Sequence, residues 1–401
     1  MYARTTIGQS LDGVIMKRTE FISRSLMDGS NLKTKVFSFT GTQSSDCPEL
    51  YVQSSVHGAE IQGYLVSLKL IEYFNKYPPK GNVTIIPLAN PYGANIKMGT
   101  YTYGRFDPAT GENWNRFYCD ISCLRKINRV HEDQIVLEEF FSEYQNLSLA
   151  QLKKKYKEKI SHSLEKLLNT PLSFSRKLNI QLQKISSSAD IVLDLHCDTD
   201  SLPHIYAPEF GVVDAVKLNF PFIIAIPEVF SGAMDEATFM PWVHFYHGLK
   251  LFMPSTYSQE ENHFRSFTLE LGPEEIICAT QADIQFNNII NFLGEMNVCS
   301  LQNEADPKKI FYEKSQVCLL ENFKTIFAPC GGAIVHSTAL GRSMNANDSL
   351  FTLSQLTSAC GDAKTIHHLT EVTHNTPCIP VTKLKTGIAL EGMPIMKVIE
   401  V

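Results

Sequence analysis

The sequence predicts an α/β fold: a mixed, largely parallel sheet flanked by helices, followed by a small all-β module at the C-terminus. The first observation is an apolar strand-like run, a helix-like run and a second strand-like run, the order of a βαβ unit, at 50–52, 61–70 and 82–88. The second is that strand-like runs resume later in the chain, at 189–196, 204–207, 221–226 and 266–271. The third is a polar linker at 303–309, beyond which short β-rich runs are separated by glycines.

These observations predict a larger α/β domain over residues 1–305 and the all-β module over residues 312–401. Residues of about 120–187 interrupt the sheet pattern as a helical elaboration, in which Ser148 is the expected N-cap of one helix. Pro273 and Glu274 predict the first turn of a later helix that runs to about Asn297.

Composition narrows the class of protein. Of the 401 residues, 44% are hydrophobic and 19% charged, which indicates a globular chain. The net charge of −6 comes without a basic face, so no nucleic-acid partner is expected. No run reaches the ~20 apolar residues of a membrane span, and the first residues contain no apolar signal segment. The ten cysteines are scattered without a Cys-x-x-Cys pair, which favours reduced thiols and a cytoplasmic location.

The first candidate site residues lie in His57-Gly58-Ala59-Glu60, between the strand-like run 50–52 and the helix-like run 61–70. Ligand sites of α/β folds lie at such strand ends. A histidine and a carboxylate three residues apart can converge on one divalent ion, and Gly58 allows the backbone to turn between them.

A third ligand is expected at His196, which ends the strand-like run 189–196. Because parallel strands end at one edge of a sheet, His57 and His196 are expected to meet there. Two imidazoles and one carboxylate leave one position of a zinc ion open for water, as in catalytic zinc sites. Asp194 and Asp198 flank His196 and are expected to support a ligand ring.

Metal-dependent hydrolysis also needs a base, and Glu270 is the candidate. It lies in the apolar run Thr268-Leu269-Glu270-Leu271, where an unpaired charge is costly to bury. One explanation is general-base duty on the attacking water. The alternative is a carboxylate at the strand tip that faces solvent or forms a salt bridge.

The long loop at 95–118 is rich in Gly, Tyr and Asn, and loops of this length in compact domains are usually functional. It contains Arg105, Asn115 and Arg116. Arginine binds carboxylates with two donors and can stabilise an oxyanion, although a surface arginine is the common alternative. His204 follows Asp198 closely and either lines the pocket or packs in the core.

The ordered motifs resemble those of zinc carboxypeptidase-like enzymes, and above all the succinylglutamate desuccinylase/aspartoacylase branch. The motifs, in chain order, are His57-Gly58-Ala59-Glu60, Asn90-Pro91, Arg105-Phe106, Asn113-Trp114-Asn115-Arg116, Asp194-Leu195-His196 and Glu270-Leu271-Gly272. The resemblance covers most of the chain from about residue 35. It also implies that residues 312–401 resemble a lipoyl-type barrel.

The resemblance implies a role for each residue. His57, Glu60 and His196 would hold one Zn²⁺ per chain, and Glu270 would be the general base. Arg105 would polarise the scissile carbonyl, while Asn115 and Arg116 would bind a substrate carboxylate. The branch has Asp-Leu-Asn-Arg where this chain has Asn113-Trp114-Asn115-Arg116, and the gap from Arg105 to Arg116 is longer. Substrate specificity and the reach of Arg105 therefore stay open.

The function expected from these features is zinc-dependent hydrolysis of an amide bond, which deacylates an N-acyl amino acid or a related small carboxylate. The alternative enzyme is a metallocarboxypeptidase that acts on short peptides. A non-catalytic metal-binding or regulatory protein is the alternative of another class, and a homo-oligomer stays open. Met396-Lys397-Val398 resembles a biotin-attachment motif, but it is close to the C-terminus and biotinylation is not expected.

Overall fold

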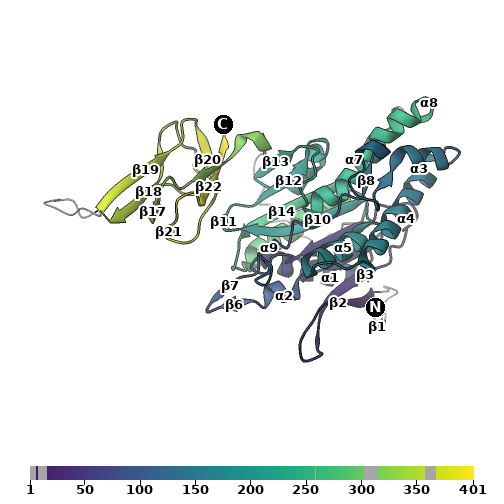
Figure 1. Cartoon of the computed structure of the whole chain (residues 1–401), viewed down its shortest axis with the longest axis horizontal. Helices are drawn as coiled ribbons and strands as arrows, with labels where there is room; N and C mark the ends of the chain where they lie inside the picture. The colour runs from purple at the N-terminus through teal and green to yellow at the C-terminus, as the bar shows by residue number, and fades with distance from the viewer. Residues whose placement is uncertain (1–5, 8–15, 258, 302–314, 357–366) are drawn as a thin grey trace.

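The computed structural model describes residues 6–7, 16–257, 259–301, 315–356 and 367–401 (Figure 1). The polar linker predicted at 303–309 lies outside these residues. The fold is the expected α/β one, with small all-β sheets at one end of the larger unit (Figure 1).

The centre of the molecule is a ten-stranded sheet whose inner strands are mostly parallel. In spatial order, its strands are β1 (Thr6–Ile7), β2 (Met16–Ser25), β3 (Asn31–Phe39), β5 (Val83–Ile86), β4 (Leu50–Ser54), β10 (Ile191–Asp198), β14 (Arg265–Pro273), β12 (His204–Pro208), β13 (Phe222–Ile226) and β15 (Gln316–Leu319). Strands β5, β4, β10 and β14 run parallel, and so do β12, β13 and β15; the other neighbours are antiparallel. The sheet is therefore mixed, as the sequence predicts.

Helices cover both faces of this sheet and bury two separate apolar cores. Helices α1 (Gln62–Lys76) and α9 (Ala279–Glu295) contact each other over one core. The other core holds α3 (Leu137–Glu143), α4 (Leu149–Leu168), α5 (Phe174–Ser186) and α7 (Met234–Phe252). Short helices are α2 (Pro91–Ala94), α6 (Val212–Ala215) and α8 (Pro254–Tyr257), with 3₁₀ turns at Lys126–Asn128, Glu209–Gly211, Val216–Leu218 and Leu320–Asn322.

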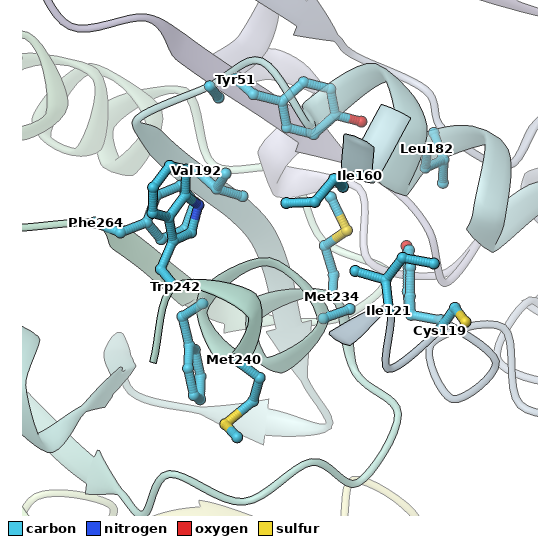
Figure 2. Packing of buried hydrophobic residues seen from close by; sticks show 14 of the residues in the cluster. Tyr51, Cys119, Ile121, Ile160, Leu182, Val192, Met234, Met240, Trp242 and Phe264 are labelled. Atoms are coloured by element: carbon cyan, nitrogen blue, oxygen red, sulfur yellow. The ribbon is translucent and has the colours of Figure 1, made fainter. Parts of the chain in front are cut away.

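The second core is rich in aromatic side chains (Figure 2). Trp242 of α7 stacks on Phe264 with 5.5 Å between ring centroids. Tyr156 of α4 buries its ring in the same core, and its hydroxyl donates to the carbonyl of Pro241 at 2.9 Å. Aromatic pairs of this kind add to the free energy gained from buried area, so they hold α4 and α7 firmly over the sheet.

The alternation of side chains along β10 decides which face of the sheet carries Asp194 and His196. Leu193 and Leu195 point into the core under α1 and α9, whereas Val192 points into the other core. Residues two apart share a face of a strand, so Asp194 and His196 follow the Val192 side. The sheet register then sets His196 opposite Glu270 on β14.

The C-terminal strands form two four-stranded sheets. One contains β16 (Phe323–Phe327), β20 (Cys378–Lys383) and β22 (Pro394–Glu400); the other contains β17 (Gly332–His336), β18 (Ser349–Leu356), β19 (His367–Thr373) and β21 (Ile388–Ala389). The fourth strand of the first sheet is β11 (Asp200–Ser201), which follows β10 directly and pairs with β20. In exchange, β15 pairs with β13 of the large sheet. Each unit thus contributes a strand to the other, and the boundary at 305–312 stays a prediction.

Several local predictions were correct and others were not. Ser148 caps α4, with a capping box completed by Gln151. The helix predicted from Pro273 is wrong at its start: Pro273 ends β14, Glu275 has a left-handed φ of 65°, and α9 begins only at Ala279. In the region of about 120–187, helices begin at Leu137. Before them lie the short parallel strands β8 (Ser122–Cys123) and β9 (Ile135–Val136), which suit the β-branched residues of β9.

Within the described residues, no helix is both long and apolar enough to cross a membrane.

Three glycines bring the backbone of the long loop against the turn after β4. The amide of Gly58 donates to the carbonyl of Gly104 at 2.8 Å. A Cβ on Gly104 would lie 2.4 Å from Gly58 Cα and 2.7 Å from the carbonyl oxygen of Gly93. Only glycine permits this close approach, and it fixes the position of the next residue, Arg105. The hairpin of β6 (Lys97–Met98) and β7 (Tyr101–Thr102) precedes it.

We predict that Gly104→Ala lowers the free energy of unfolding by about 1–3 kcal/mol, because the new methyl group has no space between two backbones. Gly331→Ala is the matched control, since a Cβ there meets its nearest atom at 3.5 Å. Chemical denaturation of both variants measures the difference. Equal stability of the two variants would show that the loop is not held by this contact.

Candidate metal centre and active site

The site is built on a sharp turn between β4 and α1. Ser55 has a left-handed φ of 58°, an uncommon conformation for a residue with a side chain. The buried side chain of Asn90 supports the turn, because its amide donates to the carbonyl of Val56 at 3.0 Å. Its carboxamide oxygen accepts from Gly93 at 2.9 Å. The Asn90-Pro91 motif is thus a structural support for the residues that follow Ser55.

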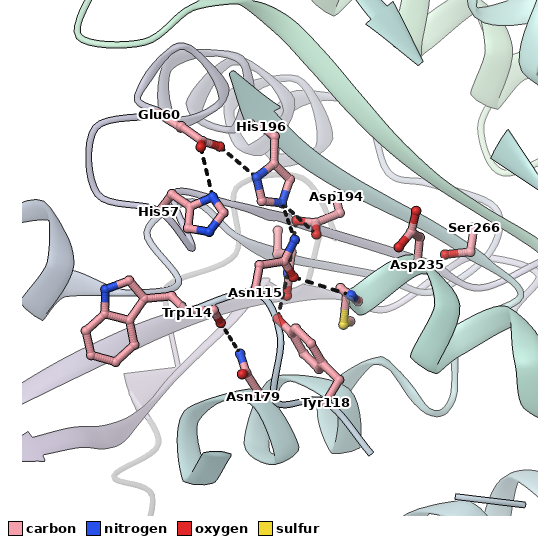
Figure 3. A network of polar contacts seen from close by, with 12 residues as sticks. His57, Glu60, Trp114, Asn115, Tyr118, Asn179, Asp194, His196, Asp235 and Ser266 are labelled. Atoms are coloured by element: carbon pink, nitrogen blue, oxygen red, sulfur yellow. Dashed lines mark hydrogen bonds and ion pairs between the residues drawn. The ribbon is translucent and has the colours of Figure 1, made fainter. Parts of the chain in front are cut away.

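This turn and the end of β10 bring His57, Glu60 and His196 together, all three buried (Figure 3). His57 Nδ1 lies 2.8 Å from Glu60 Oε1, and His196 Nδ1 lies 2.7 Å from Glu60 Oε2. The carboxylate therefore stands between the two imidazoles. Within the described residues, this is the one group of at least three His, Cys, Asp or Glu side chains with ligand atoms in reach of a common ion.

The far nitrogen of each imidazole is held by an acceptor. His57 Nε2 lies 2.9 Å from the carboxamide oxygen of Asn113, and His196 Nε2 lies 2.8 Å from Asp194 Oδ2. Both acceptors favour a proton on Nε2, so an ion could take the place of any proton on Nδ1, the nitrogen that faces the centre. Neutral imidazoles with this tautomer and an ionised carboxylate are the ligands that a divalent metal requires. The residues therefore fit a metal ion.

A buried chain of hydrogen bonds extends from this centre along one face of the sheet, from β10 to β4. Asp194 Oδ1 accepts from Gln53 Nε2 at 2.9 Å, and Gln53 Oε1 accepts from the Tyr51 hydroxyl at 2.8 Å. These side chains come from adjacent strands and are buried. Each atom in the chain has a fixed partner, so the carboxylate that orients His196 is itself held in place.

The electrostatics of the centre follow from its burial. Burial opposes the charge of Glu60, but the two imidazoles lower its pKa well below the ordinary value. Burial is also the main cause that lowers the pKa of His57. For His196, burial disfavours the charged ring, yet the carboxylates of Asp194 and Glu60 raise its pKa well above the ordinary value. Glu60 is thus an anion whose charge the ring of His196 compensates in the absence of a metal.

Glu270 stands beside His196 on the neighbouring strand β14. Its Oε2 atom is buried and has no hydrogen-bond partner among the described residues. Burial, followed by repulsion from Glu60 and Asp198, raises the pKa of Glu270 to about 8. A carboxyl group near the centre that holds a proton to neutral pH is suited to proton transfer.

The loop residues occupy different places. The half-exposed Arg105 donates from Nη1 to Glu60 Oε1 at 3.0 Å, so the long loop does reach the centre. Asn115 is buried with its side-chain nitrogen 3.4 Å from His196 Nε2. Arg116 is exposed, and its guanidinium donates to the carbonyl of Asn115 at 2.7 Å.

His204 lies opposite Glu270 on the antiparallel neighbour β12, fully buried. Its Nδ1 lies 2.9 Å from the carbonyl of Leu202, and its Nε2 has no partner among the described residues. Burial lowers the pKa of His204 to about 4, so the ring is neutral. It is next to the base rather than on the surface of the adjoining cavity.

A cavity of about 1220 Å³ adjoins the centre, with Ala59, Arg105 and Asp198 in its wall. The other wall comes from the C-terminal strands and includes Lys397 of β22, whose Nζ donates to Asp198 Oδ2 at 2.6 Å. Burial disfavours the ammonium charge, but Tyr206 and Asp198 raise the pKa of Lys397 above its ordinary value.

Sequence reasoning did not assign a site role to Asn113 or Lys397. A role for Asn113 could have been predicted, since it lies in the same motif as Asn115 and Arg116. No local pattern predicts a site role for Lys397, because only the tertiary fold brings β22 next to the end of β10. Its ion pair also explains why the Met396-Lys397-Val398 motif does not present a free lysine.

A mixed sheet of this order, with a buried His-Glu-His cluster whose ligand atoms could hold one metal ion, defines the class of α/β protein to which this chain belongs. The family model for the succinylglutamate desuccinylase/aspartoacylase catalytic domain matches residues 46–295, more than half of the chain. The chain therefore belongs to this family, which is one of deacylating hydrolases.

Solved structures agree with this assignment. A protein of the succinylglutamate desuccinylase/aspartoacylase type from Shewanella frigidimarina NCIMB 400 is 30% identical, with a TM-score of 0.83 over 96% of both chains. A family protein from Shewanella amazonensis SB2B is 31% identical, with a TM-score of 0.82 over 95% of this chain and 98% of that one. The ectoine utilization protein EutE (DoeB) from Ruegeria pomeroyi, at 14% identity and a TM-score of 0.61 over 99% and 98%, shares the fold. A search of curated proteins found no match.

The raised pKa of Glu270 predicts how stability depends on pH. In the metal-free protein the folded state holds this proton up to about pH 8, whereas the unfolded chain releases it near the ordinary value of 4.5. The Glu270 contribution to stability is therefore lost as the pH rises between these values. Glu270→Gln should be more stable than the wild type at pH 8 by about 1–3 kcal/mol, and close to it at pH 5.

Denaturant unfolding in the presence of a chelator, at pH 5 and pH 8, measures this difference. Glu391→Gln, at an exposed position, is the control and should match the wild type at both pH values. A Glu270→Gln variant that is less stable than the wild type at pH 8 would contradict the assigned environment of this carboxyl group.

Proposed function

We propose that this protein is a zinc-dependent hydrolase that cleaves the amide bond of an N-acyl amino acid or a related small carboxylate. The observation that carries the proposal is the arrangement of the centre. Both Nδ1 atoms face one carboxylate, and an unpartnered carboxyl group stands on the next strand end. Membership in a family of deacylating hydrolases supports the same reaction.

His57, Glu60 and His196 would hold one Zn²⁺ per chain. Two imidazoles and a carboxylate are a ligand set of catalytic zinc, with room for a water or substrate oxygen. When bound, the ion supplies Lewis acidity and lowers the pKa of water at the site.

Glu270 is the proposed general base. It takes the proton of the attacking water and returns it to the leaving amine. With a cation held by the three ligands, the pKa of the Glu270 carboxyl group would fall from about 8 toward the working pH, because a nearby positive charge favours the ionised form. The lack of another partner for Oε2 supports this role, since the oxygen is not used for a structural hydrogen bond within the described residues.

Arg105 is proposed to stabilise the negative charge that develops on the scissile carbonyl oxygen. Its contact with Glu60 places the guanidinium next to the centre, and its partial exposure keeps it accessible from the cavity. Asn115 and Arg116 are proposed to bind the substrate carboxylate, for which the exposed guanidinium of Arg116 is suited. His204 stays a predicted substrate-binding residue, and its place beside Glu270 also suits support of the base.

Two alternatives are less well supported. A carboxypeptidase needs room for a peptide, which a cavity of about 1220 Å³ offers, but the C-terminal strands wall it on one side and favour small substrates. A non-catalytic metal-binding protein has no need for the unpartnered carboxyl group of Glu270. A cytoplasmic location is proposed from the cysteines, which are free throughout the described residues.

Removal of a ligand and removal of the base should have different effects. His196→Ala should lose both stoichiometric zinc and activity, because the ion keeps only two ligands. Glu270→Gln should retain the zinc and lose about 10²–10⁴-fold in kcat. Elemental analysis and turnover of acyl amino acids measure the two properties, with His162→Ala, at an exposed position on α4, as the control. Full activity of Glu270→Gln, or a wild type without any divalent metal, would refute the proposal.

Substitution of the two arginines should change different kinetic parameters. Arg105→Met should lower kcat by about 10²–10³-fold, because a donor to the developing oxyanion is lost. Arg116→Met should raise KM and leave kcat nearly unchanged, because a carboxylate is bound equally in the ground state and the transition state. Steady-state kinetics of both variants test this. The opposite pattern would exchange the two proposed roles.

A further inference from the structure

The cavity beside the centre has one wall from each unit of the protein. The loop wall consists of residues 100–108, and the module wall of residues 382–397, with gaps in both. Ala59, Arg105 and Asp198 connect it to the centre. Pockets for small ligands usually measure about 300–1,000 Å³. At about 1220 Å³, this cavity has more space than an acetyl group and a short amino acid fill.

The module wall is joined by hydrogen bonds to the segment that follows β10, the strand that carries His196. Strand β11 pairs with β20 in the register Asp200↔Lys383, immediately after β10. The Thr199 hydroxyl donates to the carbonyl of Lys383 at 2.8 Å, and the amide of Leu202 donates to the carbonyl of Val381 at 3.0 Å. These hydrogen bonds join the module wall of the cavity to the segment that follows β10.

The charges in the cavity already compensate one another. Arg105 pairs with Glu60 at 3.0 Å and Lys397 with Asp198 at 2.6 Å. Lys385 donates to the backbone carbonyl of Glu274 at 2.9 Å. The lining contains three cationic side chains and three carboxylates, the latter from Asp198, Glu274 and Glu275. A substrate with two or three carboxylates would meet as many negative as positive groups there.

One cation outside the cavity lining, on the residue that follows Asn115, is not compensated. Among the described residues, no carboxylate forms an ion pair with the exposed Arg116, whose guanidinium contacts only the carbonyl of Asn115. This provides for one substrate carboxylate.

Apart from five threonines, the uncharged side chains of the lining are apolar or aromatic. Tyr101, Tyr103 and Phe106 on the loop wall expose 68%, 56% and 49% of their surfaces, although such side chains are usually largely buried. Pro394 and Met396 stand on the module wall. Aromatic side chains that converge on a cavity offer a large area for an apolar group and flat faces for a ring.

We infer that the substrate of this site is an amide with a single carboxylate and a bulky apolar group, which lies between the aromatic loop wall and the C-terminal strands. This inference rests on the proposed amide hydrolysis and names the class of substrate. The apolar group belongs either to the acyl part or to the amino acid, and the experiment separates these two cases.

The test is the kcat/KM of the full-length, zinc-loaded protein for five substrates. N-benzoylglycine has the apolar group on the acyl part, and N-acetylphenylalanine has it on the amino acid. N-acetylglycine is the small monoanion, whereas N-acetylaspartate and N-succinylglutamate are the polyanions. At least one of the two apolar substrates should exceed the other three by about tenfold or more, since even one methylene in an apolar pocket is worth about 10–200-fold.

A pair of tyrosine variants tests the wall directly. Tyr103→Ala should lower kcat/KM for the preferred apolar substrate about tenfold and change that for N-acetylglycine by less than about twofold. Tyr64→Ala, at an exposed position on α1 outside the cavity, should change neither. In a Glu270→Gln background, calorimetry should show the same loss of affinity for the intact apolar substrate, independent of turnover.

The outcomes distinguish the two proposals. Turnover with a preference for N-acetylaspartate or N-succinylglutamate overturns the inference and leaves the amide hydrolysis standing. An equal loss for all substrates in Tyr103→Ala also overturns it, because the wall then acts on the fold rather than on the apolar group. No hydrolysis of any of the five amides by the zinc-loaded protein overturns both.

Discussion

The charge of Glu60 is the constraint on which the centre depends. Its side chain is almost wholly removed from water, and an isolated carboxylate at such a position would be strongly destabilising. It is retained because polar groups surround it: the rings of His57 and His196, the guanidinium of Arg105 and the backbone amide of Cys197 at 3.1 Å. These groups come from three separate segments of the chain, so the compensation exists only in the complete fold.

The same contacts hold the side chains of the centre in their orientations. Without an ion, the ring of His196 is held between two carboxylates, Asp194 and Glu60, which favours the imidazolium. An incoming divalent ion would replace that proton and meet ligands that are already in position. The ring orientation does not depend on the ion, because Asp194 is itself fixed through Gln53. Preorganisation of this kind reduces the cost of reorganisation when the ion binds.

The sequence alone predicted the parts of the fold and the site that depend on local pattern. His57, Glu60, His196 and Glu270 all lie at strand ends, and parallel strands bring their ends together whatever the details of packing. The cap at Ser148 was predictable for the same reason, since a capping box is local. The proximity of these residues follows from the fold, whereas their roles stay proposals.

What could not be predicted depends on contacts between distant segments. Helix α9 begins at Ala279 rather than at the predicted Pro273, because backbone amides between these residues form hydrogen bonds with other segments. The amide of Glu274 donates to the carbonyl of Asp198, and that of Glu275 to the carbonyl of Ala59, both at 2.8 Å. These bonds join the segment after β14 to the two segments that carry the three candidate metal ligands, and the same amides cannot also form the first turn of a helix. Strand β2 was missed as well, because its exposed and half-buried residues give no clear alternation.

The C-terminal strands are the largest part of the chain for which the sequence pattern predicted a structure but no role at the site. A separate accessory module would need few bonds to the catalytic unit, yet here each unit contributes a strand to the other's sheet. The shared strand β11 begins two residues after Asp198, which Lys397 of the module compensates. Loss of the module would leave Asp198 without its cation, close to Glu270, and would open one wall of the cavity. The module is therefore part of the candidate active site, since it compensates Asp198 near the proposed base and forms one wall of the cavity.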